Sequence, residues 1–211
     1  MISTLPFNDH VTEYEEWFEK YPFVFQSEVE AIRDLLPVGD KLYGIEVALA
    51  TGRFAKALDI KEGVEPAPNM RALALKRGIE VLDAEAEHLP YKDLHFDFVL
   101  MSFCISYFEG LSAAFSEAKR VLKNGGSLIV GFIDRDSLIG KYYEQRKSGS
   151  IFYKQATFYP TENVSTELKK TGFKTLEFSQ TLFQELDDIT ELEVARPGYG
   201  EGSFVVIKAT K

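Results

Sequence analysis

Short apolar segments of strand length alternate with segments of helical periodicity from residue 42 to the end of the chain. Strands that alternate with helices form a mostly parallel sheet with helices on both faces. No helical pattern separates the last two apolar segments, which indicates an antiparallel last strand. The alternation therefore predicts an α/β fold with a Rossmann-like, seven-stranded, mostly parallel sheet. The expected strands cover residues 42–47, 60–64, 79–82, 96–103, 127–133, 173–180 and 203–209.

The first 37 residues precede this alternation and have a helical pattern of their own. Apolar side chains recur at helical spacing from Val11 until Pro37 interrupts the pattern, which predicts two helices. The segment is rich in aromatic residues and carries an acidic run from Glu13 to Glu19. We expect residues 1–37 to form an N-terminal helical cover over a cleft in a domain of residues 38–211. The alternative is that this segment only packs on the flank of the sheet.

Charge and composition limit the partners of the chain. Asp and Glu outnumber Lys and Arg by 33 to 24 among 211 residues, which gives a net charge of −9. Such a chain is poorly suited to binding the phosphates of nucleic acid or anionic lipid. No apolar stretch approaches the roughly 18 residues that span a bilayer, no secretory leader pattern is present, and Cys104 is the single cysteine. We expect a cytoplasmic protein with no nucleic-acid and no membrane partner.

The loop after the first expected strand is built of small residues, Ala48-Leu49-Ala50-Thr51-Gly52. In sheets of this kind, ligands bind outside the carboxyl ends of the strands, and small residues let the backbone approach a ligand closely. Glu65 ends the second expected strand, 19 residues after Glu46. An acidic residue at about this separation can accept hydrogen bonds from both hydroxyls of a ribose. The pattern indicates an adenosine site, with an ordinary loop and a solvated glutamate as the alternative.

Three longer motifs follow in the chain. They are Glu87-His88-Leu89-Pro90-Tyr91, then Phe96-Asp97-Phe98-Val99, then Arg120-Val121-Leu122-Lys123-Asn124-Gly125-Gly126-Ser127-Leu128. With these motifs the chain resembles, from about residue 42 to residue 208, the class I S-adenosylmethionine-dependent methyltransferases, especially the group that includes the ubiquinone and menaquinone biosynthesis C-methyltransferases. The resemblance implies S-adenosylmethionine as cofactor and an enzyme that transfers its methyl group to a small-molecule acceptor.

The first loop departs from the family pattern. Family members read Asp/Glu-x-Gly-x-Gly-x-Gly there, and Glu46, Ala48, Ala50 and Gly52 occupy those positions. Alanine adds a methyl group and disfavours positive φ, so we expect cofactor binding to be weakened or adjusted at this loop, at small cost if φ at both alanines is negative. This departure leaves open a non-enzymatic S-adenosylmethionine- or adenosine-binding module. A NAD-dependent dehydrogenase shares the loop and the acidic residue but not the later motifs.

The resemblance also implies how the cofactor is held. Glu65 would bind the ribose, the backbone of Ala48 and Gly52 would line the methionine side, and Ser102 would offer its carbonyl to the methionyl amine. Arg53 would face the cofactor carboxylate, with a place on the surface as the alternative.

The adenine is implied to lie against the loop before the fourth strand. There Glu85 can accept from its exocyclic amine, the Ala86 N–H can donate to a ring nitrogen, and Pro66 and Leu89 can pack on the ring faces. The expected cofactor residues are Glu46, Ala48, Ala50, Gly52, Arg53, Glu65, Pro66, Glu85, Ala86, Leu89 and Ser102.

Methyl transfer from an activated sulfonium requires alignment and exclusion of water more than an invariant catalytic group. No catalytic residue is therefore assigned. The candidates for lining the acceptor cleft are His10, Tyr14 and Tyr107, and Ser106-Tyr107 stands where many relatives carry histidines. The sequence has no cluster of Cys, His and acidic residues with metal-site spacing, so no metal is expected.

Overall fold

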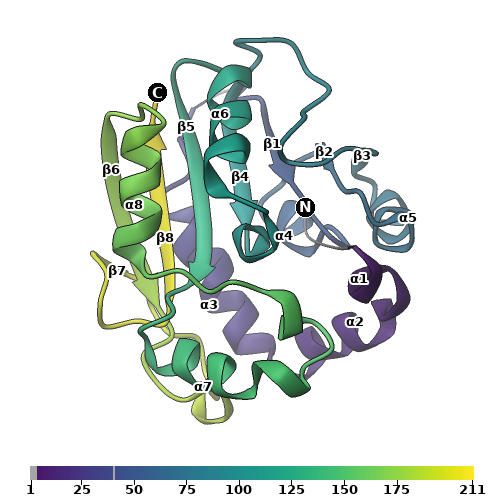
Figure 1. Cartoon of the computed structure of the whole chain (residues 1–211), viewed down its shortest axis with the longest axis vertical. Coiled ribbons are helices and arrows are strands. Elements are labelled where there is room, and N and C mark those ends of the chain that lie inside the picture. The colour runs from purple at the N-terminus through teal and green to yellow at the C-terminus, as the bar shows by residue number, and fades with distance from the viewer. Residues whose placement is uncertain (1–3, 40) are drawn as a thin grey trace.

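A twisted sheet runs through the computed structural model, which describes residues 4–39 and 41–211 (Figure 1). Within the described residues the strand order is β3-β2-β1-β4-β5-β8-β6-β7. Strands β1 to β5 pair in parallel, whereas β8 lies antiparallel between β5 and β6. Strand order reverses between β1 and β4, so the carboxyl ends of these two strands border the crevice where ligands bind in such sheets. The predicted mostly parallel, Rossmann-like sheet with an antiparallel last strand is confirmed.

The strands are β1 (Gly44–Val47), β2 (Glu62–Val64), β3 (Glu80–Leu82), β4 (Phe96–Ser102), β5 (Leu122–Ile133), β6 (Thr175–Thr181), β7 (Arg196–Pro197) and β8 (Phe204–Thr210). The helices are α1 (Leu5–Asp9), α2 (Val11–Lys20), α3 (Pro22–Arg33), α4 (Arg53–Ala57), α5 (Pro68–Lys76), α6 (Leu111–Val121), α7 (Leu138–Arg146) and α8 (Thr161–Lys170). Short 3₁₀ turns are η1 (Cys104–Tyr107), η2 (Lys147–Gly149), η3 (Tyr153–Gln155) and η4 (Leu186–Asp188).

Two hydrophobic layers flank the sheet. On one face α6 and α8 bury residues such as Phe115 and Leu168 against the sheet. On the other face α3, α4 and α7 bury residues such as Ile32 and Phe54. In Figure 1, α6 and α8 lie in front of the strands and α3 lies behind them. Because both faces are covered, the central strands are apolar along their whole length, and this is why β4 stands out in the sequence.

The N-terminal segment contains three helices rather than the two expected from the pattern after Val11. The additional helix, α1, is a single short turn before that pattern, and its five residues cannot show a helical period. Pro22, at the first position of α3, separates α2 from α3 because proline fits a helix start but not a helix interior. Helix α3 packs on β6 and β8 as part of the core, whereas α1 contacts helix α5.

One strand was not expected from the sequence. Strand β7 has two residues, Arg196 and Pro197, and pairs with Ser179 and Gln180 at the edge of the sheet. Two residues cannot show a period of two, and proline is tolerated at a sheet edge where no ladder hydrogen bond is needed.

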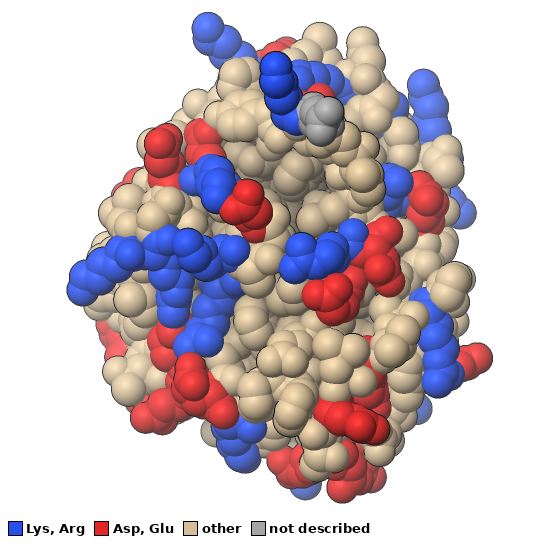
Figure 2. All heavy atoms as spheres, turned by 180° about the vertical axis from the view of Figure 1, so that it is seen from behind, with Lys and Arg blue, Asp and Glu red and all other residues tan. Residues whose placement is uncertain are grey.

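No helix in the described ranges is long and apolar enough to cross a bilayer. On the face seen in Figure 2, groups of Lys and Arg lie beside groups of Asp and Glu.

Candidate functional site

Every second residue of the loop after β1, from Ala48 to Gly52, has the left-handed backbone conformation. Ala48 has φ of +53°, Ala50 of +50° and Gly52 of +77°. Only glycine adopts this region without cost, and a non-glycine residue there costs on the order of 1–3 kcal/mol. The two alanines therefore keep the backbone of the glycine-rich loop that they replace. The sequence predicted a small conformational cost only if φ at both alanines were negative. Both φ values are positive, so this loop is strained.

The strained loop is joined to Glu65 at the end of β2. The Ala50 N–H donates to Glu65 Oε2 at 2.8 Å, and the Ala67 N–H donates to Oε1 at 2.7 Å. Burial raises the pKa of Glu65 to about 7, against these two N–H groups, which lower it. Each oxygen retains a lone pair after accepting its N–H. The loop therefore holds a buried carboxyl group that can still accept hydrogen bonds.

Gly52 is required for a second reason besides its positive φ. A Cβ atom at this position would meet the Ile79 side chain and lie 3.2 Å from the Cβ of Ala74. The turn into α4 thus packs directly on α5 and the segment before β3.

Glu46 and Ser102 meet between the carboxyl ends of β1 and β4. The Ser102 hydroxyl donates to Glu46 Oε1, while Glu46 Oε2 is buried with no partner in the described part of the chain. Burial raises the pKa of Glu46 to about 8, although the hydrogen bond from Ser102 and the backbone N–H of Ala55 lower it. A buried polar oxygen without a partner is uncommon and marks a place where a bound molecule can supply the missing donor.

The residues expected around the adenine lie on the loop between β3 and β4 and beside Glu65. Ala86 and Leu89 are buried, Pro66 is half-buried, and Glu85 is exposed. This loop is fastened by Arg120, whose guanidinium donates to the carbonyl of Leu89 at 2.9 Å. The motif that contains Arg120 thus shapes the loop from the neighbouring helix.

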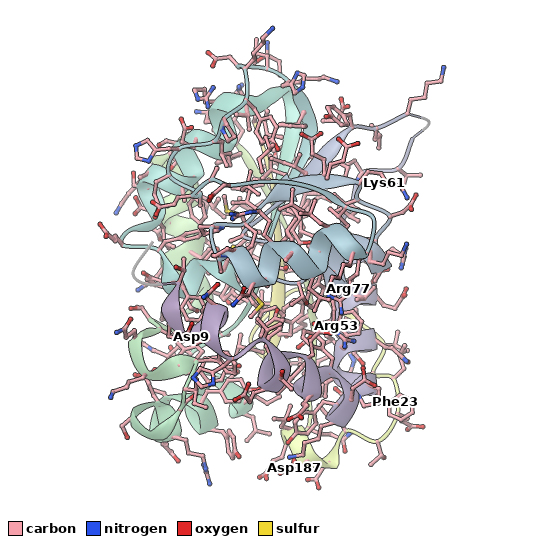
Figure 3. All side chains as sticks on the ribbon, turned by 90° about the vertical axis from the view of Figure 1, so that its right-hand side faces the viewer. Asp9, Phe23, Arg53, Lys61, Arg77 and Asp187 are labelled. Carbon is pink, nitrogen blue, oxygen red and sulfur yellow. The ribbon has the colours of Figure 1, made fainter. Side chains whose placement is uncertain are left out.

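Arg53 is engaged by the N-terminal segment. Its guanidinium donates to Glu15 at 2.7 Å and 3.0 Å, donates to Glu19 at 3.0 Å, and lies over the Phe18 ring. Arg77 donates to the same Glu15 carboxylate, and Figure 3 shows Arg53 and Arg77 close together between α5 and α2. Burial opposes ionisation of Glu15, but the hydrogen bonds that it accepts outweigh burial and lower its pKa. In this structure the Arg53 side chain is directed to α2.

A cavity of about 520 Å³ opens at the carboxyl ends of β1 and β4. Side chains of α1 and α2 form its roof, and the strained loop and Glu65 form part of its floor. Of the predicted site residues, the structure gathers six around it: Ala48, Ala50, Glu65, Ser102, Tyr14 and Tyr107.

The other predicted residues lie outside the cavity wall. His10 is bonded to Glu13 at 2.9 Å on the surface of the N-terminal segment.

The two predicted tyrosines that line the cavity, Tyr14 and Tyr107, are neutral. Burial raises the pKa values of both phenols, which keeps them protonated at neutral pH.

Several cavity residues were not foreseen from the sequence. They include Phe103, a further left-handed residue with φ of +59°, and the carboxyl group of Glu28 on α3. Glu28 shares the inner face of α3 with Val24, Ala31 and Ile32, which are fully buried. The helical period itself places this glutamate on an apolar face, and that is the signal that could have identified it.

Comparisons with known proteins agree with this geometry. The profile of the family described as "Methyltransferase domain" matches residues 45–130. An uncharacterized protein of Methanocaldococcus jannaschii is 44% identical over 205 residues, covering 97% of this chain and 98% of that protein. A demethylmenaquinone methyltransferase of Chlorobaculum tepidum is 30% identical over 166 residues, covering 66% of this chain and 69% of that protein.

Among solved structures, a Thermotoga maritima protein superposes with a TM-score of 0.96 at 45% identity, covering 99% of this chain and 100% of that chain. It is described as a SAM-dependent methyltransferase and possible histamine N-methyltransferase.

Proposed function

The chain belongs to the S-adenosylmethionine-dependent methyltransferases, and from that premise we propose which of its residues bind the cofactor and what kind of acceptor its cavity admits. The enzyme transfers the methyl group of S-adenosylmethionine to an acceptor. The observation that carries the assignment of the cofactor site is the Glu65 carboxyl group, held by the N–H groups of Ala50 and Ala67.

Glu65 fits a ribose. Its two oxygens lie side by side at the cavity floor and are fixed by backbone donors, so their remaining lone pairs can accept from two adjacent hydroxyls. The strained alanines support the same assignment, since strained backbone persists where the surrounding structure and function require it.

Glu46 and Ser102 fit the amino-acid end of the cofactor. Ser102 lines the cavity and is held by Glu46 behind it, and the Ser102 carbonyl would accept from the ammonium group of the cofactor. Ala48 and Gly52 would line this end with their backbone. Arg53 would reach the cofactor carboxylate only after leaving Glu15.

The adenine would lie beyond the ribose, against the loop before β4. Leu89 and Pro66 would pack on its faces, and Glu85 and Ala86 would meet its polar edge.

When bound, S-adenosylmethionine supplies a methyl group that is already activated by its positive sulfur. The residues of this chain then have to align the acceptor and exclude water. Tyr14, Phe103 and Tyr107 contribute to the walls around the cavity, and their rings provide an apolar surface.

We assign α1 and α2 to the cover expected for the N-terminal segment. Asn8 accepts from the Asn69 N–H at 3.0 Å, Glu15 accepts from Thr51, Arg53 and Arg77, and the hydroxyl of Tyr21, after α2, donates to Asp187 at 2.7 Å. These contacts fasten the roof of the cavity at three places.

The acceptor that we propose is a small molecule in the cytoplasm. The cavity volume lies in the range of small-ligand sites, and the net charge of −9 disfavours nucleic acid. The names of two relatives refer to different acceptors, one being a demethylmenaquinone methyltransferase and the other a possible histamine N-methyltransferase. The choice between acceptor classes therefore has to come from the cavity of this chain.

Thermal unfolding with and without ligand tests the cofactor site. S-adenosylhomocysteine at about 100 times its dissociation constant should add roughly 2.7 kcal/mol of stability, and NAD should add none. Glu65→Ala should weaken the binding of S-adenosylhomocysteine by about 100-fold, because two hydrogen bonds to a charged group are lost. Glu80→Ala, which removes an exposed glutamate from neighbouring β3, serves as the control. Equal binding by Glu65→Ala and wild type would show that another residue holds the ribose.

A further inference from the structure

A buried carboxyl group that is not among the proposed cofactor residues also lines the cavity. Glu28 on α3 is 1% exposed, and its Oε2 has no hydrogen-bond partner among residues 4–39 and 41–211. Burial raises the pKa of Glu28 well above its ordinary value. An unpaired carboxyl group in an apolar core is costly, so its presence calls for a reason other than stability.

Glu28 and Glu65 reach the cavity from different elements. Glu65 follows β2 and is held by the strained loop, whereas Glu28 lies on α3. Burial is the main cause of the raised pKa values of Tyr143 and Tyr153, and the charge of Glu28 adds to it. Because Glu28 is not among the proposed cofactor residues, we call the part of the cavity around Glu28 the acceptor end.

Aromatic rings surround this acceptor end. The rings of Tyr143 on α7 and Tyr153 in η3 lie 4.7 Å apart, and the ring of Phe158 lies 6.1 Å and 5.5 Å from them. All three line the cavity. The faces of such rings attract cations, and a carboxyl group among them adds a full opposite charge.

The lining of the cavity carries an excess of acidic groups. Four carboxyl groups line it, those of Glu13, Glu16, Glu28 and Glu65, and the only cationic side chain among the described lining residues is Lys20. The Lys20 ammonium already lies 4.0 Å from Asp187 and over the Tyr21 ring. The described residues thus leave Glu28 without a cationic partner.

We propose that the methyl acceptor carries a small cationic group, an ammonium or an imidazolium, and that Glu28 binds this group among the rings of Tyr143, Tyr153 and Phe158. The inference rests on the proposed function, since it assigns the acceptor end of the same cavity. Glu28 is an acceptor-binding residue that decides which molecules enter.

The proton balance of binding follows from the state of Glu28. Burial raises the pKa of the Glu28 carboxyl group well above its ordinary value, which favours its protonated form in the ligand-free protein. A neutral amine that binds takes this proton, whereas an amine that is already protonated binds as the proton leaves to solvent. Both routes end in the same ion pair of carboxylate and cation.

Binding of small probes in saturating S-adenosylhomocysteine tests the proposal. The cationic probes are 2-phenylethylamine and histamine, and the neutral counterpart is 2-phenylethanol. Calorimetry should detect both amines with wild type and no binding of the alcohol at the same concentration. Glu28→Gln keeps the shape but not the charge, so it should bind the amines at least about 30-fold more weakly. Glu30→Gln, on the same helix but paired with Arg33 at the surface, should bind them as wild type does.

The outcomes separate this inference from the cofactor assignment. Glu28→Gln should bind S-adenosylhomocysteine within twofold of wild type and melt at the same or a higher temperature, because a buried unpaired carboxyl group has been removed. The proposal is overturned if neither amine binds wild type, or if 2-phenylethanol binds wild type as tightly as the amines do. It is also overturned if Glu28→Gln binds the amines as tightly as wild type does, or if this variant no longer binds S-adenosylhomocysteine. Should Glu28→Gln not fold, the amine against alcohol comparison in wild type decides. Failure of wild type to bind S-adenosylhomocysteine at all would instead contradict the cofactor site.

Discussion

The floor and the roof of the cavity are held in place by different forces. On the floor, the backbone N–H of Ala50 in the strained loop and the backbone N–H of Ala67 fix the buried Glu65 carboxyl group. On the roof, α2 is fastened through side-chain contacts of Glu15 with Arg53 and Arg77. A floor fixed by backbone is preorganised for one ligand shape, while side-chain contacts at the surface can open and close. Under the proposed function, the fixed floor recognises the cofactor and the roof controls the admission of ligands.

Gly52→Ala should have the largest effect, because it breaks the floor in two ways. The new methyl group meets Ile79 and Ala74, and the residue must keep a φ of +77°. We expect a loss of about 3 kcal/mol in the free energy of unfolding, measured with urea. Gly78→Ala is the matched control, since Gly78 has φ of +83° but no atom within 4 Å of the added Cβ. It should lose only about 1 kcal/mol. Equal losses would mean that packing at Gly52 contributes nothing.

Glu15→Ala should release the roof. Thr51, Arg53 and Arg77 lose their shared acceptor, and the Glu15 side chain is 20% exposed, so screening by water reduces the effect. We expect a loss of about 2 kcal/mol in unfolding free energy, and faster digestion of the N-terminal segment by protease. The control is Glu19→Ala, because the Glu19 side chain is 77% exposed and, within residues 4–39 and 41–211, is bonded to Arg53. If both variants behave alike, Glu15 does not fasten α2.

The pH dependence of the floor should have opposite signs for stability and for ligand affinity. Glu65 and Glu46 have pKa values raised from 4.5 to about 7 and about 8. Their contribution to stability is fully present below pH 4.5 and is lost as the pH rises through these values. The ligand-free protein should therefore lose stability between pH 5 and 8. Affinity for S-adenosylhomocysteine should rise by up to about tenfold from pH 6 to 8 as the ribose acceptor ionises. Affinity that falls over this range would contradict an ionised Glu65 in the complex.

The smallest effect is expected from relieving strain in the floor. Ala48→Gly and Ala50→Gly should each raise the unfolding free energy by about 1 kcal/mol, because glycine adopts positive φ without cost. Calorimetry should show S-adenosylhomocysteine bound at least as tightly as by wild type. Ala113→Gly, at an exposed position inside α6, is the same substitution and should lower stability by about 1 kcal/mol. Destabilisation by Ala48→Gly would mean that the alanine methyl group is part of the packing.

The sequence predicted the floor better than the roof for a physical reason. The order of strands and loops in a doubly wound sheet places Ala48, Glu65 and Ser102 at one edge, so their positions follow from chain order alone. The alternation also predicted the sheet, apart from the two-residue strand β7, which is too short to show a period.

The roof depends on contacts between distant segments, which no local pattern encodes. Arg53 finds Glu15 across 38 residues of chain, and the sequence left open whether Arg53 faced the cofactor or the surface. Glu28 stands at helical spacing from apolar residues, but a glutamate in a helix is usually solvated, so this weak signal was not enough to single it out. The sign of φ at Ala48 and Ala50 likewise required the folded loop.

A crystal structure of the complex with S-adenosylhomocysteine tests the central claim most directly. We predict that both ribose hydroxyls lie within hydrogen-bond distance of Glu65, that Ala48 and Ala50 keep positive φ, and that the amino group of the ligand lies beside Ser102. A ribose bound elsewhere, or a loop that changes to negative φ on binding, would contradict the account of a preorganised, strained floor.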